Sequence, residues 1–403
     1  MISYIIAITI ILLSFYKREL GLYVASIFAP ALSTIIIPGL ETVFFFVSFF
    51  FLLIYFRDIG KLINKKFPFK TSMIFFVIVW VLSGFIAVDK HYYALFVSVA
   101  SNVVIPICCW ISFKQESNQQ LFLKIAKILC YIVVVYSLFE VLTRKNPYVD
   151  ICITEDIFTG RFIDDIRFGL KRCQAFFSYH ETLGGFCMIT GAFFQYLYFS
   201  DKTKKEIKRI CLRMMSLLYV TGFLTGSRSS MLAIVVAFFP FLLKKKKNLI
   251  VIPLLLLLLV WLMPNYFHEI EEAFLDTESV NGSNSEMRSE QLELSILYLN
   301  KSNNIWLGNG FAFADHNVVG VEKGMAGAES IWFRTMIDQG ILGILCVAYT
   351  FGLLIYRCFL LEKNYIFFPL AYLVARTIAI IPSMNLFYIF PFIMLLIKLH
   401  EKK

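Results

Sequence analysis

The chain has 403 residues, of which 59% are hydrophobic, 17% are aromatic and only 16% are charged, and its net charge is +10. About a quarter of the residues in a soluble domain are charged, so this composition excludes an ordinary water-soluble protein and indicates a membrane protein. The net charge does not indicate a nucleic-acid partner, because Lys and Arg fall in short groups between apolar runs, as they do in cytoplasmic membrane loops.

Apolar runs of about 15–25 residues recur along the chain, and this length crosses a ~30 Å hydrocarbon core as a helix. We expect such runs at 2–16, 20–38, 40–56, 71–88, 92–113, 121–142, 174–199, 211–225, 229–243, 248–263, 331–356, 364–381 and 384–397. They predict an all-α polytopic membrane protein in which residues 1–403 form a single integral membrane domain with about 12–13 transmembrane helices.

The basic residues predict the orientation of these helices. Loops 57–70 and 200–209, the run Lys244–Lys247 and the C-terminal tail are rich in Lys or Arg, and all fall on one side when the runs alternate. That side is expected to be the cytoplasm. Two long extracytoplasmic loops then remain on the other side, 143–173 and 264–328, and the second has ten acidic residues against three basic ones.

The larger loop contains a segment that looks helical near 285–300. Asn284 or Ser285 is a suitable N-cap, and apolar residues follow at helical spacing, namely Leu292, Ile296 and Leu299. Arg288 precedes Leu292 by four positions and therefore shares its face. We expect this face to rest on the membrane domain and to direct Arg288 toward the protein interior.

Three arginines on the predicted outer side are candidates for anion binding. Arg172 opens the seventh run, Arg228 lies in the TGSRSS turn between the eighth and ninth runs, and Arg288 begins the loop helix. The planar guanidinium fork suits phosphate oxygens, so three such groups near one membrane face would hold a pyrophosphate. The alternative is that each arginine anchors a helix end among lipid headgroups.

Glu329 is the candidate catalytic carboxylate, because it lies at the outer start of a long apolar run and could accept a proton from a sugar hydroxyl. The alternative is that it stabilises the helix N-terminus electrostatically. Asp338 lies deeper in the same run, where a carboxylate is either functional or paired with Arg334, four positions before it.

Other polar and sulfur-containing residues give weaker indications. His180 and Glu181 lie near the membrane edge, and Arg376 lies inside the twelfth run, but no role is assigned to them. Cys152 and Cys173 fall in or beside the first outer loop and would form a disulfide only if their geometry and an oxidising compartment allow it. The sequence has no metal-binding spacing among its nine Cys, and it has no Gly-rich phosphate loop.

At these residues the sequence resembles the O-antigen polymerase and ligase superfamily. The turn TGSRSS is similar to the family's SRS turn between two helices, and MRSEQLELSILYLNKSNNIWLGNGF is similar to its Arg-led helix and Gly turn. The segment AESIWFRTMIDQGILG resembles the last element of the family, with Gly340 and Gly343 at its glycines. Upstream, RCQAFFSYHETLGGF resembles the segment that begins with the family's Arg, here Arg172.

Two departures from the family pattern matter. Ligases of the family typically carry His in a His-Asn pair, where this chain has Glu329 and Ser330. This difference favours a polymerase. A Pro-Asn pair of the upstream motif is replaced by His180 and Glu181, so no family role is carried over to these two residues.

The resemblance implies a C-type glycosyltransferase architecture in the bacterial cell (inner) membrane, with the active site on the extracytoplasmic side. The implied substrates are undecaprenyl-pyrophosphate-linked glycan repeat units, which the enzyme would join into O-antigen, capsular or exopolysaccharide chains without cofactor or metal. Arg172, Arg228 and Arg288 would bind the pyrophosphate, Arg288 and Glu329 would act in catalysis, and a chain-length regulator and a repeat-unit flippase are the expected protein partners. The alternatives are a ligase on the same scaffold and a lipid-linked oligosaccharide flippase or transporter.

Overall fold

The structure of the protein is a computed structural model. The structure describes residues 2–37, 41–63, 65, 67–87, 90–148, 166–167, 170–200, 203, 205–244, 285–318, 321, 325, 330–378 and 385–401. The apolar run expected at 248–263 and the candidate carboxylate Glu329 lie outside the described residues.

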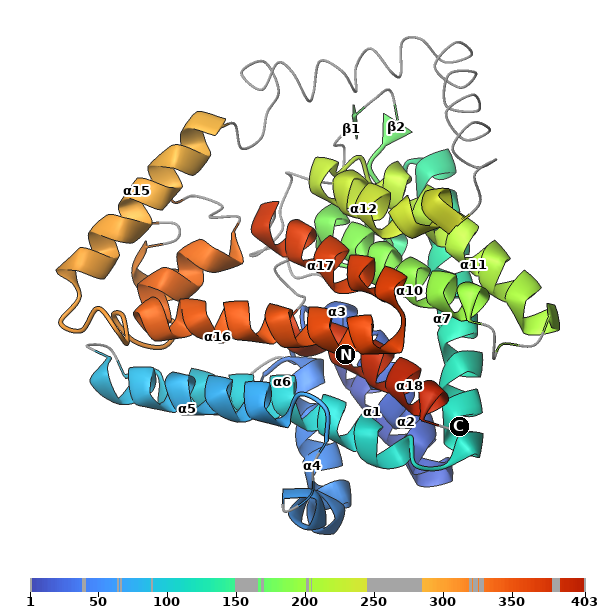
Figure 1. Cartoon of the computed structure of the whole chain (residues 1–403), viewed down its shortest axis with the longest axis horizontal. Coiled ribbons are helices and arrows are strands. Elements are labelled where there is room, and N and C mark those ends of the chain that lie inside the picture. Colours follow the sequence, from blue (N-terminus) through green and yellow to red (C-terminus); the bar gives the residue numbers. More distant parts are fainter. Residues whose placement is uncertain are drawn as a thin grey trace.

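The described part of the chain is almost entirely helical (Figure 1). The N-terminal half contains α1 (Ile2–Tyr16), α2 (Arg18–Ile27), α3 (Ala29–Leu32), α4 (Val43–Ile63), α5 (Lys70–Ile86), α6 (Tyr92–Ser112) and α7 (Glu116–Thr143). A short hairpin of β1 (Ile166–Arg167) and β2 (Leu170–Lys171) then leads into α10 (His180–Phe199), α11 (Lys205–Leu224) and α12 (Arg228–Lys244). The remaining elements are α15 (Ser285–Lys301), the π-helix η1 (Ala314–Val318), α16 (Ile331–Leu361), η3 (Lys363–Ile366), α17 (Phe367–Ile378), η4 (Leu386–Ile389) and α18 (Phe390–His400).

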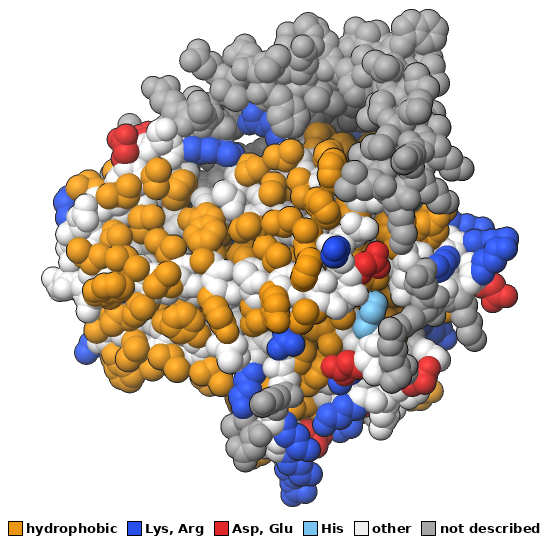
Figure 2. All heavy atoms as spheres, viewed as in Figure 1, with side chains coloured by type: hydrophobic (Ala, Val, Ile, Leu, Met, Phe, Trp, Pro, Cys, Tyr) orange, Lys and Arg blue, Asp and Glu red, His pale blue; other side chains and the backbone are white. Residues whose placement is uncertain are grey.

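The lengths and composition of these helices are those of a membrane protein. Among the described residues, four helices are long and apolar enough to cross a bilayer, Val43–Leu62, Tyr92–Ser112, Glu116–Thr143 and Ile331–Leu361. Shorter apolar helices accompany them, including Lys70–Ile86 and Arg228–Pro240. Figure 2 shows a broad face covered by hydrophobic side chains, with Lys and Arg gathered mainly near its edges. Exposure of such a large apolar face is unfavourable in water but favourable against lipid tails.

Helix α10 lies at the centre of the part of the molecule that holds the candidate site. Nearly all of its side chains are buried, and it packs against α11, α12, α17 and α18. Gly184 allows the closest approach, because a Cβ at this position would overlap the Ser230 side chain at the start of α12. The first turn of α10 is therefore held directly against the α11–α12 turn.

One predicted run is not a single helix. The sequence predicts a continuous helix over 20–38, but the structure ends α2 at Ile27 and begins α3 at Ala29. Pro30 occupies the first turn of α3, where its missing N–H is tolerated, whereas the interior of a longer helix would lose a hydrogen bond there. The prediction of one helix over 20–38 is therefore wrong.

Helix α16 is broken at Gly340, whose backbone has φ 60° and ψ −149°. The segment 304–311 fills the break with hydrogen bonds of its own. The carbonyls of Ile337 and Asp338 accept from the N–H groups of Asn309 and Gly310 at 2.9 and 3.0 Å. On the other side of the break, the N–H groups of Ile341 and Leu342 donate to the carbonyls of Ile305 and Trp306 at 3.1 and 3.0 Å. Backbone groups that the kink would leave unpaired are thus satisfied, as a membrane interior requires.

Candidate active site

Arg172, which follows the β1–β2 hairpin, packs against the turn between α11 and α12. Arg172 is only 6% exposed, and its Nε donates to the carbonyl of Thr225 at 3.0 Å. Its Nη2 also lies 3.5 Å from Oε1 of Glu181, at the start of α10. The structure therefore brings the Arg172 segment and the TGSRSS turn together, although Arg172 and Thr225 are 53 positions apart in the sequence, as expected for a site assembled from loops on a rigid scaffold.

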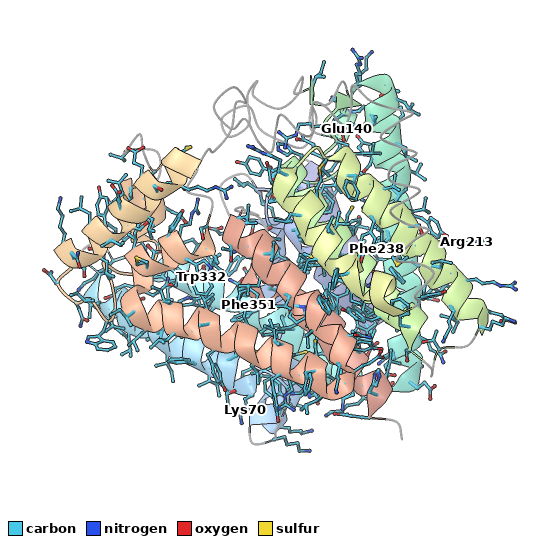
Figure 3. All side chains as sticks on the ribbon, turned by 45° about the horizontal axis from the view of Figure 1, so that its top comes forward. Lys70, Glu140, Arg213, Phe238, Trp332 and Phe351 are labelled. Carbon is cyan, nitrogen blue, oxygen red and sulfur yellow. The ribbon has the colours of Figure 1, made fainter. Side chains whose placement is uncertain are left out.

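A buried carboxylate near the end of α7 shapes the segment that follows Arg172. Oε2 of Glu140 accepts hydrogen bonds from the N–H groups of Gln174 and Ala175 at 3.0 and 2.8 Å. Nδ2 of Asn146 donates to the carbonyl of Ala175 at 2.9 Å. Ala175 has a φ of 49°, an unusual conformation for a residue with a side chain, and these contacts hold it. Figure 3 labels Glu140 at the upper end of the view.

The turn between α11 and α12 is fixed by small hydroxyl side chains. Gly226 has a φ of 62°, and Oγ of Ser227 accepts from the N–H of Ser230 at 3.5 Å, as an N-cap residue does. Ser227 and Ser229 are also hydrogen-bonded through their hydroxyls at 3.0 Å. Arg228, half-buried, is the first residue of α12. A cation at a helix N-terminus opposes the helix dipole, so its placement there favours a nearby anion.

The pair that the sequence left without a role lies beside Arg172. His180 is 3% exposed, and its Nε2 forms a close ion-pair contact with Oε1 of Glu181, the same oxygen that faces Arg172. His180, Glu181 and Arg172 thus form a connected polar cluster at the first turn of α10. Glu181 offsets part of the positive charge of Arg172 and holds its guanidinium in one orientation.

Helix α15 carries Arg288 but does not pack as the sequence predicts. Leu292 and Ile296 are 41% and 42% exposed, whereas Gln291 and Ser295 are fully buried. The expectation that the Leu292 face rests on the membrane domain is therefore wrong. Arg288 is half-buried and precedes Gln291 by three positions, so the two lie on the same side of the helix.

Gln291 is the most conspicuous polar residue that the sequence analysis missed. Both Nε2 and Oε1 of its side chain are buried, and neither has a hydrogen-bond partner among the described residues. A buried amide without a partner is unfavourable, and such groups often face a ligand. The sequence offers one indication of a role for Gln291, namely its position three residues after Arg288 on the same side of the helix. A polar residue at that spacing is equally typical of an ordinary solvent-exposed helix face, so the sequence alone does not single it out.

The polar residues at the start of α16 are arranged differently from the sequence expectation. Oδ1 of Asp338 accepts from the N–H of Ala314 at 2.6 Å, so this carboxylate fixes the start of η1. Arg334 forms its ion pair with Asp315, at 2.5 Å, and not with Asp338. Arg334 also lies close enough to Arg376 for the two positive charges to interact. Sequence spacing alone could not bring Arg334 and Arg376 together, because they belong to different helices.

Four helix ends surround one region of the molecule. The starts of α12, α15 and α16 and the end of α17 lie around it in both ribbon views (Figures 1 and 3). Nε1 of Trp332 donates to Oγ1 of Thr377 at 3.0 Å and thereby joins the last two of these ends. Arg228, Arg288 and Arg334 are carried by three of the four ends, within one turn of the first residue.

The structure therefore gives different outcomes for the individual site residues. Arg172 is joined to the turn that carries Arg228, and Arg288 lies near the end of a helix that faces the same region. Glu329 immediately precedes Ser330, the N-cap of α16, whose Oγ accepts from the N–H of Trp332 at 3.3 Å, but Glu329 itself is not described. Cys173 is buried without a disulfide, and Cys152 is outside the described residues, so their pairing stays a prediction.

Comparison with known proteins supports the resemblance. No curated protein matches the chain. A family model described as "Wzy_C: O-Antigen ligase" matches residues 214–348, which include the TGSRSS turn, α15 and the broken start of α16. This family comprises glycosyltransferase-like enzymes. Residues 214–348 therefore match an O-antigen ligase family domain, which is consistent with the O-antigen polymerase and ligase superfamily, and the long apolar helices are those of a membrane protein.

Proposed function

We propose that the protein is a polymerase that joins undecaprenyl-pyrophosphate-linked oligosaccharide repeat units into O-antigen, capsular or exopolysaccharide chains. One observation carries the proposal: the buried Arg172 is hydrogen-bonded to the backbone of the turn that presents Arg228. An arginine that only anchors a helix end would reach headgroups and would not be buried in such a contact. The arrangement suits a fixed binding site for a pyrophosphate.

The proposed reaction transfers the growing glycan to a new lipid-linked unit. The oxygen of a hydroxyl at the non-reducing end of the incoming unit attacks the anomeric carbon of the growing chain. A bond forms between these two atoms, and the bond from the anomeric carbon to the pyrophosphate oxygen breaks. Undecaprenyl pyrophosphate leaves with the bonding electrons, and the hydroxyl proton passes to a base, for which Glu329 is proposed.

The arginines would act mainly by electrostatics. Negative charge develops on the pyrophosphate as it leaves, and Arg172, Arg228 and Arg288 are proposed to stabilise it in the transition state. Glu181 and His180 would hold Arg172 in position, because Glu181 already faces its guanidinium. The buried amide of Gln291, beside Arg288, is suited to a sugar hydroxyl or a phosphate oxygen.

The proposal includes a topology and a location. The chain would be one integral domain of about 12–13 helices in the bacterial cell membrane, with loops 143–173 and 264–328 on the extracytoplasmic side. The acidic second loop would cover the glycan, and a repeat-unit flippase and a chain-length regulator would act with the enzyme. No nucleic acid is involved.

A ligase is the second candidate, and the description of the matching family favours it. Glu329 and Ser330, in place of the His and Asn that ligases of the family typically carry, favour the polymerase. A flippase or transporter remains the alternative of another class, but the polar groups gather at one end of the molecule, whereas a transporter site usually lies near the bilayer midplane.

Deletion of the gene distinguishes these functions. For a polymerase, we expect single repeat units on the lipid carrier or on the final acceptor, with long chains absent from electrophoresis of the extracted glycans. Re-expression of the chain should restore the long chains. Long chains that persist without attachment to their acceptor would instead show a ligase, and repeat units trapped on the cytoplasmic side would show a flippase.

A further inference from the structure

A second candidate binding site lies at the other end of the molecule, where α4 ends and α5 begins. Figure 3 labels Lys70 at the lower edge of the view, at the opposite end from Glu140. A cavity of about 310 Å³ opens there between α4, α5 and α6. Its walls include Ile59 and Leu62 of α4, Ile74 and Ile78 of α5, and Ile107 of α6.

The cavity is apolar except at one point. Among the described residues that line it, Lys70 is the only one with a polar side chain. Its volume is roughly that of ten water molecules, but an apolar cavity offers water no hydrogen-bond partners and therefore does not hold it stably. Ile74 and Ile78, which are 47% and 49% exposed, extend the apolar surface toward the bilayer. A hydrocarbon chain is the occupant that matches these walls.

The position of Lys70 is fixed by the turn that precedes α5. Phe69 has a φ of 65°, is 1% exposed and stacks on Phe390 with ring centroids 4.5 Å apart. This packing holds Lys70 as the first residue of α5, and its Nζ lies 3.5 Å from the carbonyl of Lys65. Within the part of the chain that the structure describes, no side chain caps the start of α5. A cation placed against the helix dipole is favourable when an anion binds beside it.

The surroundings of Lys70 add further positive charge. The exposed residues Arg57, Lys61 and Lys65 belong to the same segment. Asp58 is the one acidic residue between 57 and 70, and its Oδ2 lies 3.8 Å from Arg18, so its charge is partly offset already. The cavity is partly open and is called the groove from here on; Lys70, Arg57, Lys61 and Lys65 form its cationic rim. An apolar groove with such a rim suits a lipid that has a hydrocarbon chain and a negative headgroup.

We propose that this groove binds an anionic glycerophospholipid, with one acyl chain between α4, α5 and α6 and the phosphate against Lys70. The anionic lipid of a bacterial cytoplasmic leaflet is the source that fits, because the rim lies on the side with the basic loops. The site is separate from the arginine cluster and does not depend on the proposed reaction. Such a site would make the protein bind anionic glycerophospholipids in preference to neutral ones.

The test uses the purified full chain in detergent. Phosphatidylglycerol and phosphatidylcholine with the same acyl chains are titrated in turn, and bound lipid is counted by native mass spectrometry together with the melting temperature. We expect phosphatidylglycerol to bind more tightly and to raise the melting temperature more. Lys70→Gln should weaken its binding about fivefold, since each basic residue near an anionic surface contributes about that factor. Lys70→Arg should restore it.

Two matched pairs of variants separate the groove from the general surface. Ile74→Trp should fill the groove and abolish tight binding, whereas Leu82→Trp, at a similarly exposed position of α5 that does not line the cavity, should not. Lys205→Gln, at the exposed start of α11, controls for loss of charge. Each variant is first shown to be monodisperse, so that a failure to fold is not read as a failure to bind.

Three results would overturn the proposal. The first is equal binding of phosphatidylglycerol and phosphatidylcholine to the unaltered chain. The second is unchanged phosphatidylglycerol binding in Ile74→Trp, which would show that only surface charge attracts the lipid. The third is displacement of phosphatidylglycerol by a small excess of undecaprenyl phosphate, which would identify a polyprenyl lipid as the occupant.

Discussion

Substitution of single arginines distinguishes a role in phosphate binding from a role in lipid anchoring. Arg228 and Arg288 are half-buried, whereas Arg172 is buried and hydrogen-bonded to the carbonyl of Thr225, so substitution of Arg228 or Arg288 gives the sharper test. If each supplies charge-assisted hydrogen bonds to the pyrophosphate, replacement by Ala should remove about 2–4 kcal/mol of transition-state stabilisation. The rate should then fall roughly thirty- to thousand-fold, measured as polymer formed at matched membrane levels.

Substitution by Lys separates the two interpretations. Lys keeps the charge but loses the planar fork, so Arg228→Lys and Arg288→Lys should recover only part of the activity. An anchoring arginine would tolerate Lys almost fully. Arg144 is the control, because its side chain is exposed and its backbone carbonyl, which accepts from Lys171 at 2.8 Å, is kept in Arg144→Lys. Normal polymer from both Arg228→Ala and Arg288→Ala would refute the arginine clamp.

At the scale of a single element, the break in α16 gives a prediction about stability. A Cβ at residue 340 would overlap the carbonyl oxygen of Ile305, and the φ of 60° is strained for Ala. We expect Gly340→Ala to destabilise the protein by at least about 2 kcal/mol and to lower its melting temperature in detergent.

The same helix supplies the matched control. Gly352 is exposed, and a Cβ there would meet nothing within 4 Å. Gly352→Ala should be neutral or should stabilise the helix by about 0.5–1 kcal/mol, since Ala has the higher helix propensity. An equal response of the two variants would mean that the docking of segment 304–311 does not depend on the conformation of Gly340.

The elements also show what the sequence could predict. The segment 121–142 lies within α7 (Glu116–Thr143) and 92–113 nearly coincides with α6, because a long apolar run in a bilayer has to satisfy its backbone as a helix. The break at Gly340 could not be predicted, since it depends on a segment about thirty residues earlier in the chain. The face of α15 was mispredicted because spacing shows only which residues share a face and not which face packs on the protein, and Leu292 and Ile296 are exposed here.

The candidate site was predictable to a similar degree. The TGSRSS turn and the Arg172 segment stood out as polar groups between apolar runs. Their direct contact through Thr225 could not be read from spacing, and neither could the support that Glu140 gives from α7. Arg334 and Arg376 seemed to be separate helix residues until the fold brought their charges into range. Pairwise contacts between distant segments are the information that one sequence lacks.

For the whole molecule, the distribution of basic residues predicts which loops face outward. In a background without reactive cysteines, single Cys probes in 143–173 and 264–328 should react with a membrane-impermeant maleimide in intact cells. Probes in 57–70 and 200–209 should react only after the membrane is opened. Outside labelling of probes in Lys244–Lys247 would reverse the orientation and the proposed mechanism with it.

The docking of segment 304–311 into α16 has a consequence for the order in which the protein assembles. A helix that enters the bilayer with a break exposes backbone donors and acceptors, which is unfavourable until another segment covers them. Here the covering residues precede the helix in the chain, so the ribosome has released Ile305 and Trp306 before Ile341 and Leu342 emerge. Biosynthesis from the N-terminus thus presents the partner first, and the gap can close as the part of α16 that follows Gly340 enters the membrane.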